Sequence, residues 1–152
     1  MDADAAARLA EAFAEAWARP SLAAFRPLLA DDVRLSAPFM DDTAGVEEGL
    51  GELARLLRLW PDVRGEVHRW GATADGVLIE WTMRGRLGRA DVAVPAVDRI
   101  VIRDGLIAER VAYFDTLPLL AAALRQPRLW PAVLRSGLGP SARLRRAARR
   151  RA

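Results

Sequence analysis

Two Asp-Gly pairs divide the second half of this chain into segments in which apolar and polar residues alternate. Asp75-Gly76 and Asp104-Gly105 are typical of tight hairpins, because glycine accepts the positive φ that a type I′ turn requires. Alternation with a period of two predicts strands that bury one face. We expect these strands at residues 63–72, 77–87, 91–103 and 106–115. Successive hairpins join neighbouring strands, so the pattern predicts an antiparallel sheet.

The first half of the chain has the period of helices. Leu9, Phe13 and Trp17 recur at intervals of four residues and predict an amphipathic helix over residues 4–19. We expect further helices at residues 22–29, 46–59 and 119–124, and a strand at 33–37. Helices that precede a run of hairpins predict an α+β fold, in which the helices cover one face of the sheet.

Composition limits the chemistry of the chain. Its 152 residues, 52% of them hydrophobic, are enough for one globular domain. The absence of cysteine excludes disulfides and thiolate metal sites, and a single histidine, His68, argues against a zinc centre. We therefore expect no metal. No apolar run has the length of a membrane span, and the N-terminal sequence MDAD is acidic where a secretory signal is basic, which predicts a cytoplasmic protein.

Charge is distributed unevenly along the chain. Up to Asp115 there are 14 arginines and 20 acidic residues, whereas from Thr116 onward there are nine arginines and no acid. Prolines and glycines interrupt residues 127–140. We therefore expect a folded domain of residues 1–125 and a basic, partly ordered tail of residues 126–152.

This basic tail has three interpretations. The first is a solvated chain end, and it is the one we favour. The second is attraction to nucleic acid or to an acidic membrane surface, and the third is docking on the acidic body of a partner subunit. Nucleic-acid binding is not expected, because no base-reading motif accompanies the arginines.

Three stretches of the chain resemble the nuclear transport factor 2-like superfamily, and within it the SnoaL-like polyketide cyclases and ketosteroid isomerases. These stretches are LLADDVRL at residues 28–35, DRIVIRDGLI at 98–107 and YFD at 113–115. The resemblance implies a cone: a curved antiparallel sheet whose concave face is covered by the N-terminal helices. It also implies a homodimer through the outer face of the sheet. The apolar residues expected on that face are Val97, Val101, Ile107 and Val111.

Most catalytic positions of these relatives are not retained. Ketosteroid isomerases use a tyrosine and a buried aspartic acid as oxyanion hole and an aspartate as base, and these positions correspond to Phe13, Asp98 and Ala37. Only Asp98 keeps its residue type, and without a base near Ala37 that mechanism cannot move its proton. The Asp-Arg-Asp set of limonene epoxide hydrolases, also not retained, corresponds to Met83, Trp81 and Ala112.

Asp98 has two interpretations that the sequence leaves open. Burial in apolar surroundings disfavours a charged carboxylate, and a neutral Asp98 would donate a hydrogen bond to a ligand carbonyl, whereas an ionised one would act as a base. Alternatively, Arg110 or Arg84 crosses the sheet and holds Asp98 in a structural ion pair.

Four other polar residues are weaker candidates. Asp41 and Asp42 precede the helix at residues 46–59, where capping explains at least one of them. Asp41 would also reach the mouth of the pocket and stand in for the missing base. Asp115 is interpreted as a helix cap, and His68 as a surface residue and outside candidate for a base.

The resemblance thus implies a cofactor-independent enzyme of isomerase or cyclase type, or a binder, for an apolar carbonyl-bearing ligand such as a polyketide or steroid-like ring system. Asp98 and Asp41 are the expected catalytic residues. The residues expected to bind the ligand are Phe13, Trp17, Ala37, Trp60, Trp81, Met83, Arg110, Ala112 and Phe114. The alternative is a non-catalytic, dimeric module for ligand binding or interaction, in which the tryptophans fill the core.

Overall fold

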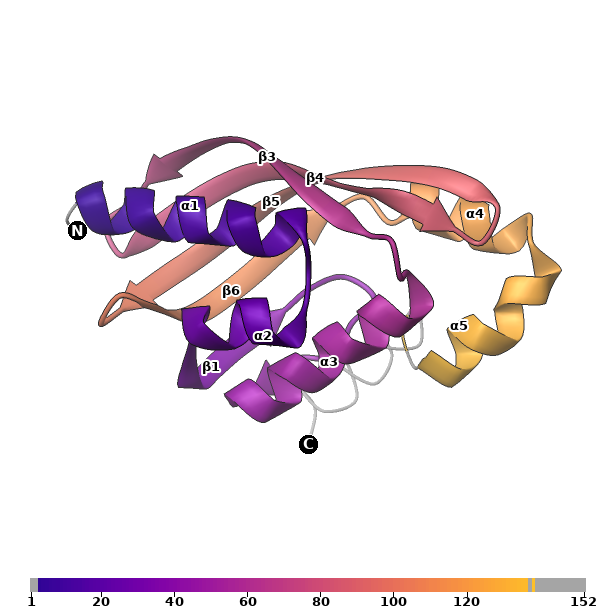
Figure 1. Ribbon diagram of the computed structural model, residues 1–152, viewed down its shortest axis with the longest axis horizontal. Helices are drawn as coiled ribbons and strands as arrows, with labels where there is room; N and C mark the ends of the chain where they lie inside the picture. The colour runs from indigo at the N-terminus through magenta and orange to yellow at the C-terminus, as the bar shows by residue number, and fades with distance from the viewer. Residues whose placement is uncertain (1–2, 137, 139–152) are drawn as a thin grey trace, which may run out of the picture.

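The strands of the second half pair in sequence order, as their hairpins predict. The computed structural model, which describes residues 3–136 and 138, has one bent, open sheet with the strand order β2-β1-β6-β5-β4-β3 (Figure 1). The strands are β1 (Leu29–Ser36), β2 (Thr43–Ala44), β3 (Arg64–Ala72), β4 (Gly76–Leu87), β5 (Ala90–Arg103) and β6 (Leu106–Phe114). The expected α+β fold with a curved sheet is confirmed.

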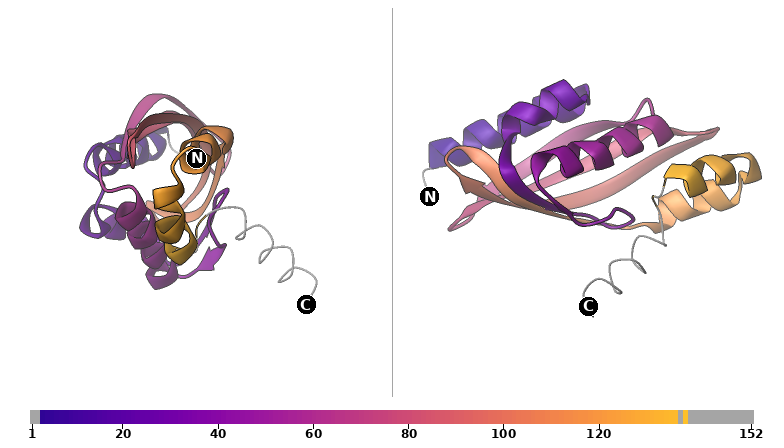
Figure 2. Two further views of the ribbon diagram at one scale, coloured as in Figure 1. Left: turned by 90° about the vertical axis from the view of Figure 1, so that its right-hand side faces the viewer. Right: turned by 90° about the horizontal axis from the view of Figure 1, so that it is seen from below.

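The helices lie on one side of this sheet and at one of its ends. The chain forms α1 (Ala3–Ala18), α2 (Leu22–Phe25), the 3₁₀ turn η1 (Arg26–Leu28), α3 (Val46–Leu59), α4 (Leu117–Leu124), the 3₁₀ turn η2 (Pro127–Leu129) and α5 (Trp130–Ser136). Helices α1, α2 and α3 cover the concave face, while α4 and α5 lie at one end of the sheet (Figures 1 and 2). Helix α2 is shorter than predicted, because Pro27 has no N–H for the next helical hydrogen bond.

The sheet is mixed, and not purely antiparallel as the hairpins alone predict. Strand β1 pairs with β6 in parallel, with Leu35 opposite Arg110. This pairing joins the first strand of the chain to the last, so no local turn specifies it. All pairs within β3, β4, β5 and β6 are antiparallel.

The two Asp-Gly pairs form different turns. Asp104 and Gly105 have φ of 54° and 78°, which is the type I′ hairpin that the sequence predicts. Gly76 does not have a positive φ, so the same prediction is wrong there. The three residues 73–75 connect the strands instead, and a hydrogen bond from Thr73 N to Gly76 O, 2.9 Å, closes the turn. Glycine is needed because a Cβ at position 76 would lie 1.7 Å from Ile100 O.

The outer face of the sheet differs from expectation at one residue. Ile107 is buried and faces the concave side, because an irregularity in the β5–β6 pairing shifts the alternation between residues 107 and 109. Val97 is exposed, as expected for a residue on the outer face. The large exposed side chains Trp70, Leu78 and Tyr113 also come from the sheet. Homodimerisation through this face stays a prediction.

Aromatic side chains pack where α1 crosses the sheet. The ring centroids of Trp17 and Trp81 are 4.5 Å apart, and those of Phe13 and Trp81 are 5.4 Å apart in an edge-to-face arrangement. Gly65 on β3 allows this close approach, because a Cβ there would lie 2.7 Å from Trp17 Cβ and 2.9 Å from the Trp81 ring.

We therefore expect Gly65→Ala to lower the free energy of unfolding by about 1–3 kcal/mol, the usual cost of overpacking. The matched control is Gly71→Ala on the same strand, where an added Cβ meets no atom within 4 Å. Urea denaturation followed by tryptophan fluorescence measures both. Equal effects of the two substitutions would contradict the packing argument.

A single glutamine joins the C-terminal helices to the sheet. Gln126 Nε2 donates to Leu87 O and Ala122 O, both at 3.0 Å, and Gln126 Oε1 accepts from Arg89 N at 2.7 Å. At the start of α4 the N-cap position is Thr116, and Asp115, one residue earlier, accepts from Leu117 N through Oδ1 at 2.9 Å, so it satisfies an N–H of the first helical turn. These bonds place α4 and α5 against the open end of the cone.

Candidate functional site

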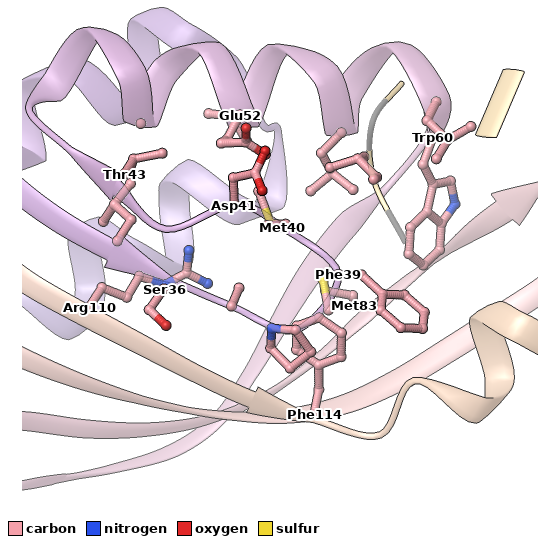
Figure 3. A pocket seen from close by; sticks show the side chains of 18 of the residues that line it. Ser36, Phe39, Met40, Asp41, Thr43, Glu52, Trp60, Met83, Arg110 and Phe114 are labelled. Carbon is pink, nitrogen blue, oxygen red and sulfur yellow. The ribbon is translucent and has the colours of Figure 1, made fainter. Parts of the chain in front are cut away.

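A cavity of about 150 Å³ lies between α3, the concave face of the sheet and the C-terminal helices. Its wall is mainly apolar, and the segment between β1 and β2 forms one side of it (Figure 3). Of the residues predicted for the site, the cavity wall includes Phe13, Trp17, Ala37, Asp41, Trp60, Met83, Arg110 and Phe114. The structure thus brings most of the predicted residues around one space.

Three of the predicted residues do not belong to that wall. Asp98, Trp81 and Ala112 are buried in the sheet but do not line the cavity. Trp81 packs against the rings of Phe13 and Trp17, which do line the cavity. Asp98 is fully buried on β5 and is paired with Arg110 of the neighbouring strand.

The pairing of Asp98 distinguishes the two interpretations of this residue. Arg110 Nε donates to Asp98 Oδ2. Arg84 instead pairs with Glu66, with 3.2 Å between Arg84 Nε and Glu66 Oε2. In this structure Asp98 is thus paired with Arg110, and Arg110, not Asp98, belongs to the cavity wall.

Arg110 lies among aromatic rings. Its guanidinium carbon is 5.6 Å from the ring centroid of Phe13 and 5.8 Å from those of Trp17 and Trp81, within the range of cation–π attraction. The side chain is 18% exposed, so water screens it only in part. Asp98 Oδ1 has no hydrogen-bond partner among the described residues, which leaves Arg110 as the group that compensates this buried carboxylate.

Two carboxyl groups lie on the opposite side of the cavity. Figure 3 shows Asp41, from the segment after β1, and Glu52, from α3, with their carboxyl groups directed toward each other, while Arg110 reaches in from β6. Both acids belong to the cavity wall. Glu52 is 3% exposed and forms an ion pair with Arg55 on the next helical turn. The helix begins after Gly45, so neither Asp41 nor Asp42 occupies its N-cap position.

Glu52 is a site residue that the sequence analysis missed. It lies in the apolar stripe of α3, three residues after Gly49 and four before Leu56, both of which also face the cavity. An acid in the buried stripe of an amphipathic helix was the signal, since buried glutamates are rare unless paired or functional.

The segment that carries Asp41 has a strained backbone. Phe39 has φ of 64°, the left-handed region that a bulky residue rarely adopts, and it lines the cavity. Thr43 follows with a buried Oγ1 that has no hydrogen-bond partner among the described residues. Strain and unpaired polar atoms of this kind cluster at ligand sites.

Most of the sheet and its covering helices match a known family. The family described as SnoaL-like domain matches residues 10–110. This chain belongs to the SnoaL-like domain family. No curated protein matches the sequence significantly.

Solved structures share the fold of this SnoaL-like domain. A proposed SnoaL-like polyketide cyclase from Jannaschia sp. CCS1 has 16% identity and a TM-score of 0.69, over 80% of this chain and 95% of its own. An LEH-like epoxide hydrolase from M. tuberculosis has 24% identity and a TM-score of 0.66, over 80% and 91%. A protein of ketosteroid isomerase-like fold from Catenulispora acidiphila, in complex with trimethylamine, has 23% identity and a TM-score of 0.69, over 75% and 90%. At these identities the likeness shows the fold alone.

His68, the outside candidate for a base in this SnoaL-like domain, does not line the cavity. His68 is on the outer face, where its Nε2 is 2.7 Å from Thr82 Oγ1. Across the described residues, no three histidine, cysteine or acidic side chains gather in a way that would hold a metal ion. None of the helices that the structure describes is long and apolar enough to cross a membrane.

Proposed function

We propose that this SnoaL-like protein binds a small, mainly apolar carbonyl compound and moves a proton at the carbon next to the carbonyl. The observation that carries the proposal is the position of Arg110 across one apolar cavity from Asp41 and Glu52 (Figure 3). A fixed cation on one side and two carboxyl groups on the other are the groups that enolate chemistry requires.

The cation supplies the electrostatic part of this chemistry. A carbonyl oxygen beside Arg110 would accept a hydrogen bond from the guanidinium and would keep that bond as it gains negative charge. Asp98 holds Nε of the same group, so the guanidinium is oriented before the ligand binds. The surrounding rings limit the access of water to Arg110, which strengthens the interaction.

The carboxyl pair supplies the proton transfer. One carboxylate takes the α-proton; the C–H electron pair becomes the C=C bond of an enolate, and the π pair of the C=O bond moves onto the carbonyl oxygen. In a ligand with a C=C bond next to the α-carbon, the second carboxyl group, when protonated, returns a proton at the γ-carbon of the dienolate, which shifts the double bond and completes an isomerisation. Alternatively, the enolate carbon attacks a second carbonyl of the same ligand, which closes a ring, and the alkoxide that forms takes the proton of the second carboxyl group. Two carboxyl groups in one apolar site can supply an acid and a base together.

The size of the cavity narrows the ligand class. About 150 Å³ is the volume of an engineered protein cavity that binds benzene. A ligand core of one ring or two fused rings would fill this space, and because the cavity is partly open, a larger ligand would extend beyond it. We therefore propose that the reacting part of the substrate is no larger than one or two rings.

Exchange of α-protons in D₂O tests the proposal without knowledge of the natural substrate. With 2-indanone as the probe, we expect the protein to accelerate loss of the α-proton NMR signal at least 10²-fold over protein-free buffer, since a positioned general base contributes about 10²–10⁴-fold. The control is the same protein with Arg110→Met. Binding of 2-indanone without any acceleration would instead support the non-catalytic binding module.

A further inference from the structure

We infer that α4, η2 and α5 form a docking surface for a membrane that contains anionic lipids. The surface consists of the exposed apolar residues of these helices together with their exposed arginines. It is independent of the proton-transfer chemistry, because none of its residues belongs to the group of Arg110, Asp41 and Glu52.

The apolar part of this surface is concentrated in a short stretch of chain. Leu117 and Leu124, seven residues apart on α4, are 67% and 65% exposed. Trp130 and Leu134, four residues apart on α5, are 47% and 80% exposed. Residues seven or four apart lie on the same face of a helix, so each helix presents an apolar pair to solvent.

The tryptophan of the α5 pair is held against α4. Trp130 Nε1 donates to Ala123 O at 2.9 Å, which fixes the indole against the end of α4 beside Leu124. A tryptophan with a satisfied N–H and an exposed ring is typical of membrane interfaces, where one part of the side chain is apolar and the other polar.

The charge around these residues has one sign. Arg125, Arg128 and Arg135 are exposed on the same stretch, and the sequence from Thr116 to the end contains nine arginines and no acid. Anionic lipid surfaces attract such segments with about a fivefold gain in affinity for each arginine near the surface. The combination of exposed leucines, tryptophan and arginine fits a lipid interface, whereas nucleic acid would leave the leucines without partners.

A second copy of the chain is a weaker occupant for this surface. Eight carboxylates of the acidic body already form ion pairs with arginines of the same body. The negative charge of the body is therefore partly neutralised by its own arginines. The anionic headgroups of a lipid surface are not paired with arginines in this way, so they attract the exposed arginines more strongly.

The position of this surface connects it with the cavity. Leu119, Leu120 and Ala123 of α4 and Val133 of α5 line the cavity from the inner side of the same helices. A protein docked through these helices would hold the cavity next to the lipid. An apolar ligand would then enter from the membrane and would not have to cross water.

Co-sedimentation with vesicles tests the inference on the full chain. We expect the protein to bind vesicles of phosphatidylcholine with 30% phosphatidylglycerol at least tenfold more strongly than pure phosphatidylcholine vesicles in 50 mM NaCl, as about 1 kcal/mol per arginine near the surface implies. Raising the salt to 500 mM should remove most of this preference, as screening predicts.

Two pairs of variants separate the docking surface from general charge or hydrophobicity. We expect Arg128→Glu with Arg135→Glu to lower binding at least tenfold, while Arg8→Glu with Arg19→Glu has a much smaller effect. This control makes an equal charge change at two exposed arginines, one on α1 and one directly after it. We expect Leu124→Ser with Leu134→Ser to lower binding at least fivefold, while Leu22→Ser with Leu78→Ser, also exposed leucines, does not. Circular dichroism checks that each variant is folded.

Three results would overturn the inference. The first is no preference for the anionic vesicles. The second is vesicle binding that the two leucine substitutions do not weaken, together with equally strong binding of the protein to a DNA duplex at the same salt. That result would assign the arginines to nucleic acid. The third is an increase in protein mass in light scattering that the α5 substitutions abolish and that competes with vesicle binding, which would assign the surface to a second copy.

Discussion

Arg110→Met is expected to lower the free energy of unfolding by about 3–5 kcal/mol, because it leaves the fully buried carboxylate of Asp98 without its counter-charge. The loss is large because the other oxygen of Asp98 has no partner among the described residues that would share the charge. Methionine retains the length and packing of the arginine stem among the rings of Phe13 and Trp17. Urea denaturation measures the change.

The double variant Asp98→Val with Arg110→Met identifies the origin of this loss. Removing both charges together is often close to neutral, so we expect the double variant to be less destabilised than Arg110→Met alone, by at least about 2 kcal/mol. The surface pair of Arg84 and Glu66 is the matched control: both side chains are more than half exposed, and Arg84→Met should cost less than about 1 kcal/mol. If Arg110→Met costs no more than Arg84→Met, Asp98 is not held as a carboxylate by Arg110, and the neutral, hydrogen-bond-donating Asp98 becomes the better description.

The sequence pattern and the hairpin register together predict that Arg84 is not the partner of Asp98. Asp98 pairs across the sheet with Ile79, so residues of β4 at even spacing from Ile79 share its face. Trp81 and Met83 meet that condition, and Arg84 does not. Alternation alone therefore assigns Arg84 to the outer face once the register of the hairpin is known. The face on which Arg110 lies is harder to predict. Counting alternate residues from the Asp104-Gly105 turn gives the wrong face, because the irregularity between Ile107 and Glu109 shifts the alternation along β6.

The local signals predicted the local structure well and the long-range pairing poorly. Helix α3 has the bounds predicted from its apolar period and from Pro61, and the meander follows its turns. The parallel contact of β1 with β6 joins segments about 75 residues apart, and no turn residue encodes such a contact. The same distance in sequence explains why the cavity wall was predicted only through resemblance, since it combines α1, α3, β6 and the C-terminal helices.

The carboxyl pair shows a different limit of sequence reasoning. Asp41 was predicted from its place before α3, but its neighbour Glu52 was assigned only to the helix that contains it. The position of Glu52 in the apolar stripe is readable from the sequence. Its proximity to Asp41 is not, because it depends on a segment eleven residues earlier that folds back under α3 (Figure 3). An isolated acid in a buried stripe is therefore a reason to look for a second acid nearby.

The largest effect on chemistry is expected from Glu52→Gln. If Glu52 transfers the α-proton, the isosteric amide should lower the rate of 2-indanone exchange in D₂O at least 10²-fold, because a positioned carboxylate contributes about 10²–10⁴-fold. Asp41→Asn should lower the rate as well, because the second carboxyl group of the pair is then lost. Glu47→Gln, an exposed glutamate on the first turn of the same helix, should leave the rate unchanged.

Binding and stability measurements separate catalysis from structure in these variants. If Glu52 acts on the proton alone, Glu52→Gln should retain the affinity for 2-indanone, measured by tryptophan fluorescence, while the exchange rate falls. Arg110→Met should weaken both, because the guanidinium contacts the carbonyl in the bound state and in the enolate. Unchanged exchange in both Glu52→Gln and Asp41→Asn would remove the carboxyl pair from the mechanism. Arg110 and the apolar wall would then remain as a binding site that orients a carbonyl ligand without moving its proton.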